Sequence, residues 1–246
     1  MRPAEAYGGF AWAYDPALGS RFFRAIEPRL DRLIARAPIP SLRHLDVACG
    51  SGLAVEWFAA RGFESVGLDA SLPMLSMASA RGGKLVAGDM RAIPLRGEFG
   101  IVTSLYDSLN HLLSRGDLVA TFRSIASVMA AGGIFFFDVN HPEVYRRVWA
   151  VEEPYESSDA NHLLIMKTRF SETFQRGVAE ISGWAEVGGR RRKIRETRRQ
   201  RAWGETAIRE ALGKTGLECM EVVPFDPWNE DDEEPAKLIF IARKSR

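Results

Sequence analysis

The sequence predicts an α/β fold in which a doubly wound, mostly parallel sheet carries helices on both faces. Between residues 42 and 139, five short apolar segments of strand character alternate with amphipathic segments of helical character. The apolar run Ile134-Phe135-Phe136-Phe137 is typical of a strand that is buried on both faces, as parallel strands are. After residue 203 a helix and two further strands close the pattern, and the last strand is expected to be antiparallel.

Strand and helix boundaries follow from apolar periodicity and from the residues at the ends. Ser71 can cap a helix that runs to about residue 81, and Gly62 suits the end of the helix before it. Gly132 and Gly133 are expected to end a helix that starts near residue 115. The expected strands are 42–48, 65–69, 84–89, 100–106 and 133–139, and the expected helices between them are 53–62, 71–81 and 115–131.

Outside the sheet domain, the sequence predicts two further segments, an N-terminal helical lid and an inserted β cap. Residues 1–40 have helical character until Pro38 and Pro40, and are expected to form an N-terminal helical lid. Alternating residues over 150–203, with Gly188-Gly189 suited to a hairpin turn, predict an inserted antiparallel β cap. The sheet domain then comprises 41–149 and 204–246, with a helix over 204–216 and strands over 217–225 and 237–244.

Composition excludes several classes of protein. The chain has 246 residues, of which 46% are hydrophobic, and its 33 Lys and Arg against 32 Asp and Glu leave a net charge of +1. This is enough apolar content for a core, without the overall basicity of many nucleic-acid-binding chains. Cys49 and Cys219 cannot form a disulfide framework and lack metal-ligand spacing, so no metal is expected. We see neither a membrane span nor a signal peptide, and expect a cytoplasmic protein.

A run of small residues follows the first expected strand, at 48–52. Small residues at the C-terminal end of a strand let a ligand approach the backbone, and the next helix offers unpaired N–H groups. Asp69 ends the second strand, and a carboxylate there can accept hydrogen bonds from both hydroxyls of a ribose. Together these features predict a nucleoside cofactor.

The identity of the nucleoside depends on the motifs. The dinucleotide fingerprint requires a glycine where this chain has Val55, which disfavours NAD and FAD. The string Asp46-Val47-Ala48-Cys49-Gly50-Ser51-Gly52 instead resembles motif I of the class I S-adenosylmethionine-dependent methyltransferases. The resemblance continues through Asp69, Gly88-Asp89-Met90 and Leu105-Tyr106-Asp107, each at the end of an expected strand, and covers about residues 40–140.

The resemblance implies a Rossmann-like fold, S-adenosyl-L-methionine as the cofactor, and roles for individual residues. The Ala48–Gly52 turn would pack against the methionine part, Asp69 would bind the ribose, and Leu105 and Tyr106 would lie near the sulfonium. Segments 7–15 and 104–112 further resemble bacterial sugar and secondary-metabolite methyltransferases, which would place Tyr14 in a lid. The implied cofactor-binding residues are Tyr14, Asp46, Ala48, Gly50, Gly52, Asp69, Asp89, Met90 and Leu105.

Methyl transfer needs alignment more than a protein nucleophile, because the cofactor carries an activated methyl group. We propose no covalent intermediate, since neither cysteine has the Pro-Cys context of cytosine methyltransferases. The catalytic candidates are His111 and Tyr106, and the alternative for a single histidine is a structural role. Asp107, Asn110 and His141 are further candidates near the same strand ends, and Asp89 has the alternative of a helix cap.

Two charged segments remain. Residues 190–201 hold eight basic side chains offset by Glu196 alone, and residues 226–234 hold six acids. The basic segment is interpreted either as an exposed edge strand whose charges prevent aggregation, or as a surface that binds an anionic substrate or RNA.

The leading functional hypothesis is methyl transfer from S-adenosylmethionine to a nitrogen or oxygen of a small molecule, by direct in-line displacement. The acceptor would be anionic if residues 190–201 face it, and neither nucleic acid nor membrane is expected as a partner. The alternatives are an RNA or protein methyltransferase that docks through 190–201, a NAD-dependent oxidoreductase, and a nucleoside-binding module without activity. No heptad pattern predicts an oligomeric state.

Overall fold

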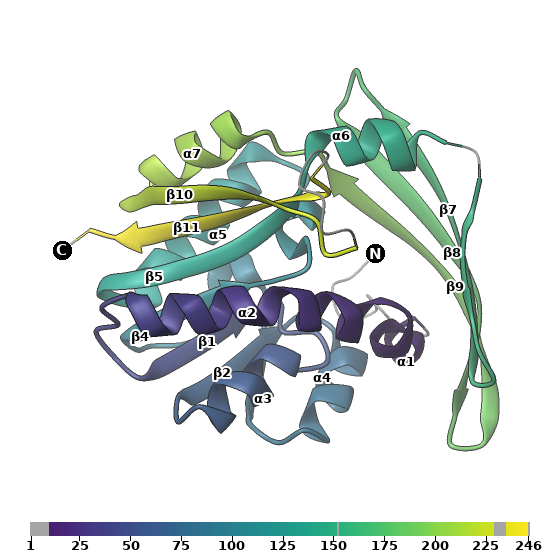
Figure 1. Ribbon diagram of the computed structural model, residues 1–246, viewed down its shortest axis with the longest axis horizontal. Helices are drawn as coiled ribbons and strands as arrows, with labels where there is room; N and C mark the ends of the chain where they lie inside the picture. The colour runs from purple at the N-terminus through teal and green to yellow at the C-terminus, as the bar shows by residue number, and fades with distance from the viewer. Residues whose placement is uncertain (1–9, 152, 229–234, 246) are drawn as a thin grey trace.

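The computed structural model describes residues 10–151, 153–228 and 235–245, which form two sheets (Figure 1). The larger sheet has seven strands in the order β10-β11-β5-β4-β1-β2-β3. Its strands are β1 (Arg43–Val47), β2 (Glu64–Asp69), β3 (Lys84–Ala87), β4 (Phe99–Ser104), β5 (Met129–Asn140), β10 (Leu217–Phe225) and β11 (Lys237–Lys244). The first five are parallel, and β11 pairs antiparallel with both β5 and β10. The predicted fold class is confirmed.

Helices cover both faces of this sheet. On one face, α2 (Ser20–Arg36) and α3 (Leu53–Ala60) bury residues such as Ile26 and Phe58 against Phe136 of β5. On the other face, α5 (Arg115–Val128) and α7 (Glu205–Gly213) pack on Phe135 and Phe137. The remaining helical segments are α1 (Ala11–Tyr14), η2 (Asp15–Gly19), α4 (Leu72–Ser79), η3 (Met90–Ala92), η4 (Ser108–His111), α6 (Pro142–Val144) and η5 (Tyr145–Trp149).

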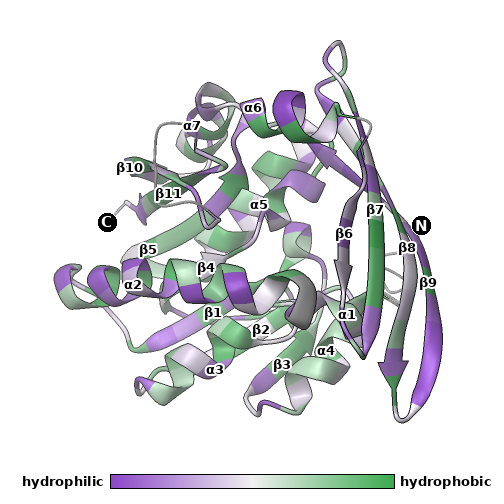
Figure 2. Ribbon diagram, turned by 45° about the vertical axis from the view of Figure 1, so that its right-hand side comes forward, coloured by the Kyte–Doolittle hydropathy of each residue, from purple (hydrophilic) through white to green (hydrophobic). Residues whose placement is uncertain are grey.

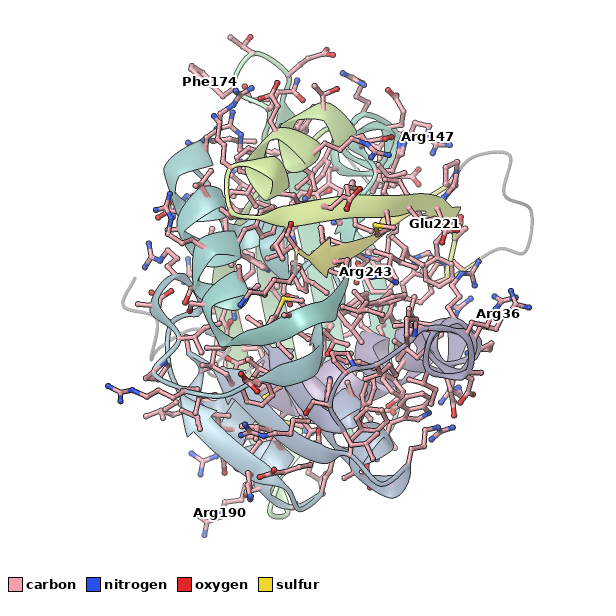
Figure 3. All side chains as sticks on the ribbon, turned by 90° about the vertical axis from the view of Figure 1, so that its left-hand side faces the viewer. Arg36, Arg147, Phe174, Arg190, Glu221 and Arg243 are labelled. Carbon is pink, nitrogen blue, oxygen red and sulfur yellow. The ribbon has the colours of Figure 1, made fainter. Side chains whose placement is uncertain are left out.

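The four-stranded antiparallel sheet has the order β6-β7-β8-β9. Its strands are β6 (Tyr155–Ser158), β7 (His162–Ser171), β8 (Arg176–Val187) and β9 (Arg190–Arg201). Gly188 and Gly189 both have positive φ and join β8 to β9 in the predicted hairpin. Figure 2 shows this sheet beside the larger one, with β7 largely hydrophobic and β9 largely hydrophilic. In Figure 3, Phe174 of the β7–β8 turn and Arg190, which follows the β8–β9 turn, lie at opposite ends of the molecule.

The N-terminal helical segment joins the two sheets. Phe10 and Ala13 are buried against Ile181 of β8 and Ile194 of β9, while α1 also contacts α4 beside the larger sheet. The segment between the sheets therefore fixes the inner face of the four-stranded sheet relative to the ends of the parallel strands.

One boundary differs from the sequence expectation. The helix expected over 115–131 ends at Val128, and β5 begins at Met129, three residues before the glycine pair. A Cβ on Gly133 would lie 2.9 Å from the Ala130 oxygen and 3.0 Å from the Phe99 oxygen. Gly133 therefore serves a close backbone approach at an irregularity of the β4–β5 pairing, Gly132 has a positive φ of 75°, and neither ends the helix. Of the helices described, none is both long enough and apolar enough to cross a membrane.

Candidate functional site

A cavity of about 1050 Å³ opens at the C-terminal ends of the parallel strands, between the larger sheet and β9. This is the edge where open α/β sheets bind ligands. Side chains from the lid, the strand ends and β9 line it together. Among them are all the predicted site residues except Gly52: Tyr14, Asp46, Ala48, Gly50, Asp69, Asp89, Met90, Leu105, Tyr106 and His111.

The turn after β1 forms one wall of the cavity. Ala48, Gly50 and Gly52 all have positive φ, and the Gly52 amide donates to the Cys49 oxygen at 2.9 Å. Gly52 points away from the cavity, toward α4, where a Cβ would lie 3.0 Å from Cβ of Ala78. Its role is thus to let α3 and α4 approach, whereas Gly50 faces the ligand space.

Asp69 fixes this turn from the neighbouring strand. Its carboxylate accepts the Gly50 amide at 2.8 Å and the Ser71 amide at 2.7 Å. Burial raises the pKa of Asp69, while these backbone hydrogen bonds oppose the shift. Each carboxylate oxygen has a second lone pair, so Asp69 can hold the turn and still accept hydrogen bonds from the cavity.

Asp46 lies at the floor of the cavity, at the end of a buried hydrogen-bond chain. The Thr103 hydroxyl donates to Asp46 at 2.6 Å, and His44 Nε2 lies 2.9 Å from the same hydroxyl oxygen. Because Thr103 gives its one proton to Asp46, His44 must donate through Nε2 and accept the Ser65 hydroxyl, 2.8 Å away, at Nδ1. Burial raises the pKa of Asp46 to about 7, against the Thr103 hydrogen bond and with repulsion from Asp69.

Asp89 and Met90 form the far wall of the same cavity. The Asp89 carboxylate accepts the Arg91 amide at 2.9 Å, so it caps the short η3 turn, and it also pairs with the Arg91 guanidinium. The Arg91 side chain lowers the pKa of Asp89. The cap interpretation of Asp89 therefore holds for its carboxylate, while the residue also borders the ligand space.

Asp15 links the N-terminal helical segment to the turn after β1, and the sequence did not indicate this role. The Ser51 hydroxyl donates to Asp15 at 2.6 Å, and Arg81 of the α4–β3 connection donates at 2.8 Å. Asp15 is buried, and the adjacent Tyr14 ring lies 5.6 Å from the Tyr106 ring across the cavity. An acid directly before Pro16 in an otherwise apolar helical stretch is the signal that could have indicated it.

The segment after β4 places Tyr106 and His111 in the cavity wall. Burial lowers the pKa of His111, against the attraction of Asp107. The other candidates are used elsewhere. Asn110 binds backbone atoms of Arg201 and Asn140, and His141 caps α6 by accepting the Glu143 amide at 3.2 Å. Neither Asn110 nor His141 lines the cavity.

The basic segment divides between the two faces of β9. Arg198 is only 6% exposed, pairs with Glu196 and lines the cavity, whereas most of the other basic side chains of the strand are exposed. Ile194 is the apolar residue whose alternation with 196, 198 and 200 could have identified the inner face. Residues 229–234 of the acidic segment and 1–9 of the expected lid lie outside the described residues.

The residues that line the cavity suit a nucleoside. Asp69 provides a carboxylate at a strand end for hydroxyl groups, Asp46 provides a second carboxylate, and Met90 and Leu105 provide apolar walls for a base. Across the described ranges, no three His, Cys, Asp or Glu side chains converge as metal ligands would. Fold and site together define a nucleoside-dependent α/β enzyme.

Comparison with known proteins specifies the class. Residues 45–133 match the family model described as a methyltransferase domain. YqeM of Bacillus subtilis (strain 168), a protein named as a methyltransferase, is 27% identical over 246 residues, which cover 98% of either chain. The chain therefore contains a methyltransferase domain and has the fold of the S-adenosylmethionine-dependent methyltransferases.

Two solved structures and one sugar-modifying relative are also similar. An S-adenosylmethionine-dependent methyltransferase from Clostridium acetobutylicum ATCC 824 has a TM-score of 0.79 at 19% identity, covering 96% of this chain and 98% of the other. Streptomyces venezuelae DesVI has a TM-score of 0.76 at 21% identity, covering 95% and 96%. A dTDP-3-amino-3,4,6-trideoxy-alpha-D-glucopyranose N,N-dimethyltransferase from Streptomyces venezuelae is 36% identical over 92 residues, which are 37% of this chain and 39% of the other.

Proposed function

We propose that this methyltransferase acts on a nitrogen or oxygen atom of a small molecule, by direct in-line displacement without a covalent protein intermediate. The observation that carries the proposal is one continuous cavity that the cofactor-binding turn shares with Tyr106, His111 and Arg198. Its volume of about 1050 Å³ is large enough for a nucleoside and a small acceptor together. Both reactants can therefore lie in one cavity, which favours their alignment.

The cofactor that we propose is S-adenosylmethionine. When bound, it supplies a methyl group on a sulfonium, and a nitrogen or oxygen nucleophile attacks that methyl carbon as the thioether leaves. The chain's own residues hold and shield it. In our proposal the Ala48–Gly52 turn and Asp46 face its methionine part, Asp69 binds the ribose, and Asp89 and Met90 border the adenine. Leu105 and Tyr106 stand beside the reacting centre, and Tyr14 closes the lid over it. The cavity wall contains each of these residues except Gly52, which supports the assignment.

His111 is our candidate for the group that removes the acceptor's proton. Its pKa is lowered by burial, so its ring is neutral at neutral pH and able to accept a proton. An ammonium must lose a proton before its nitrogen can attack, and a hydroxyl must lose one during attack. A neutral imidazole in the cavity wall suits either need, which supports the assignment to a nitrogen or oxygen acceptor.

The known relatives favour an amine of a sugar or similar metabolite among the small molecules. The N,N-dimethyltransferase described above is named for an amino sugar substrate, and it is similar to this chain over part of its length. The RNA-docking and NAD alternatives are not favoured. Three basic residues of β9, Arg195, Arg198 and Arg199, line the cavity and suit a small anionic acceptor. Buried Val55 replaces the third glycine of the dinucleotide fingerprint.

The test is an acceptor screen with methyl-labelled S-adenosylmethionine. The panel contains amino sugars, their nucleotide-linked forms, phenols, an RNA and a bacterial protein extract, and mass spectrometry locates the label. We expect label in a small molecule, and a loss of about 100-fold in turnover for His111→Asn. His141→Asn is the matched control, because His141 caps α6 outside the cavity and should leave turnover unchanged. Label confined to RNA or protein would contradict the proposal.

A further inference from the structure

The turn between β4 and η4 holds two residues in an unfavourable conformation. Tyr106 and Asp107 have φ values of 57° and 51°, in the left-handed region that side chains other than glycine rarely adopt. Each such residue costs about 1–2 kcal/mol. Adjacent residues in this state persist only where other groups fix the backbone, and such strain collects at functional sites. Tyr106 lines the cavity, so this turn sets the position of its ring.

The backbone of the turn is held by a buried carboxylate. Asp138, near the end of β5 and fully buried, accepts the Tyr106 amide at 2.5 Å and the Asp107 amide at 2.9 Å. Asp138 accepts both amides best when it is ionised, because a protonated carboxyl uses one of its oxygens as a donor. Burial raises the pKa of Asp138, and a nearby positive charge opposes that shift.

Lys237, the first residue of β11, provides that charge. Its ammonium donates to Asp138 at 2.9 Å, to Asp107 at 2.7 Å and to Asn140 at 2.9 Å. An ammonium has three protons, so these acceptors use its full capacity. Burial alone would lower the pKa of Lys237, but the charges of Asp107 and Asp138 raise it, and the side chain is a cation. Lys237 is itself 2% exposed, so it acts from behind the cavity wall.

The hydrogen-bond network around Lys237 extends to the four-stranded sheet. Asp107 accepts the Gln200 side-chain amide of β9 at 2.6 Å, and that amide nitrogen lies 3.4 Å from His111 Nε2. Gln200 also accepts the Tyr145 hydroxyl at 2.7 Å. Lys237 is thus connected to Tyr106 through Asp138 and by its own contact with the Tyr106 ring, 4.9 Å from the ring centroid. It is connected to His111 through Asp107 and Gln200.

We propose that Lys237 is a positioning residue for methyl transfer, holding the Tyr106–Asp107 turn and through it the acceptor end of the cavity. The proposal deepens the function proposed above and rests on it for the roles of Tyr106 and His111. The network serves no cofactor contact of its own, since Lys237, Asp138 and Gln200 do not line the cavity. A change at Lys237 should therefore affect turnover while leaving cofactor affinity intact.

The test compares Lys237→Met with Lys244→Met. Both lysines are in β11, and Lys244 donates to the Met129 backbone oxygen at the opposite end of the strand, so its variant controls for loss of a lysine there. For Lys237→Met we expect S-adenosylhomocysteine affinity within about twofold of wild type. Turnover of the acceptor found in the screen should fall about 100-fold, as for a misplaced reacting group. The amide resonances of Tyr106 and Asp107 should shift in Lys237→Met and stay in place in Lys244→Met.

A second variant separates positioning from charge burial. In Lys237→Met with Asp138→Asn, the unpaired carboxylate is removed, but the asparagine has one oxygen for two backbone amides. We expect this double variant to recover stability without recovering turnover, and it carries the test if Lys237→Met does not fold. Wild-type turnover, or unchanged Tyr106 and Asp107 resonances in a folded Lys237 variant, would overturn the proposal. The resonances decide the matter even if the screen finds no acceptor, so failure of the proposed function is separately visible.

Discussion

Asp69→Ala gives the most quantitative test of the cofactor site. In the structure Asp69 accepts the Gly50 and Ser71 amides, so its loss should lower the free energy of unfolding by about 1–3 kcal/mol. In our proposal the same carboxylate binds the ribose hydroxyls. A hydrogen bond to a charged group contributes about 1.5–3 kcal/mol, which corresponds to about 10-fold to 150-fold in affinity for each hydroxyl.

The two effects are separated by changing the ligand as well as the protein. Calorimetric titration with S-adenosylhomocysteine and its 2′-deoxy analogue gives a cycle in which the protein-only cost cancels. The wild type should bind the deoxy analogue about 10-fold to 150-fold more weakly, whereas Asp69→Ala should bind both ligands alike. If Asp69→Ala discriminates between the two ligands as strongly as the wild type does, Asp69 does not bind that hydroxyl and the assignment is refuted.

Two further predictions concern stability. Burial raises the pKa of Asp46 from 3.8 to about 7 in the folded protein. Between about pH 4 and pH 7, Asp46 is therefore protonated in the folded state and ionised in the unfolded state. The free energy of unfolding should then fall as pH rises from about 4 to 7, by at most about 1.4 kcal/mol per pH unit. Asp46→Asn should flatten this slope in urea titrations. An unchanged slope would mean that other groups cause the pH dependence. Gly100→Ala should destabilise by about 1–3 kcal/mol, because a Cβ would lie 2.0 Å from the Ser41 backbone oxygen. Gly116→Ala in α5, whose nearest atom would be 3.7 Å away, is the control and should be neutral or stabilising; equal thermal midpoints for the two variants would contradict the predicted clash at Gly100.

The sequence predicted the parts of the molecule that depend on local pattern. Strand β5 was recognisable from its apolar run, and the turn after β1, which lines the cavity, from small residues followed at a fixed spacing by Asp69. Both signals lie within one βαβ unit, where spacing and position in the fold are tied together. The end of α5 was placed wrongly because a glycine pair is equally suited to a helix end and to a close approach between strands.

The polar network behind the cavity could not be predicted in the same way. Lys237 and Asp138 are separated by 99 residues, and nothing in their local sequences distinguishes them from a surface lysine and a strand-end acid. Asp15 and Ser51 likewise meet only because the lid lies between the two sheets. Such contacts depend on tertiary placement, which periodicity and motif spacing do not contain.

The most direct test of the central claim is calorimetric titration of the protein, freed of bound nucleosides, with S-adenosylmethionine, S-adenosylhomocysteine and NAD. We predict saturable binding of the two sulfur-containing nucleosides at one site and no binding of NAD. Val55 and the Asp46–Gly52 turn are the basis of that discrimination. Binding of NAD in place of the sulfur nucleosides, or binding of none of the three, would contradict the cofactor site described here.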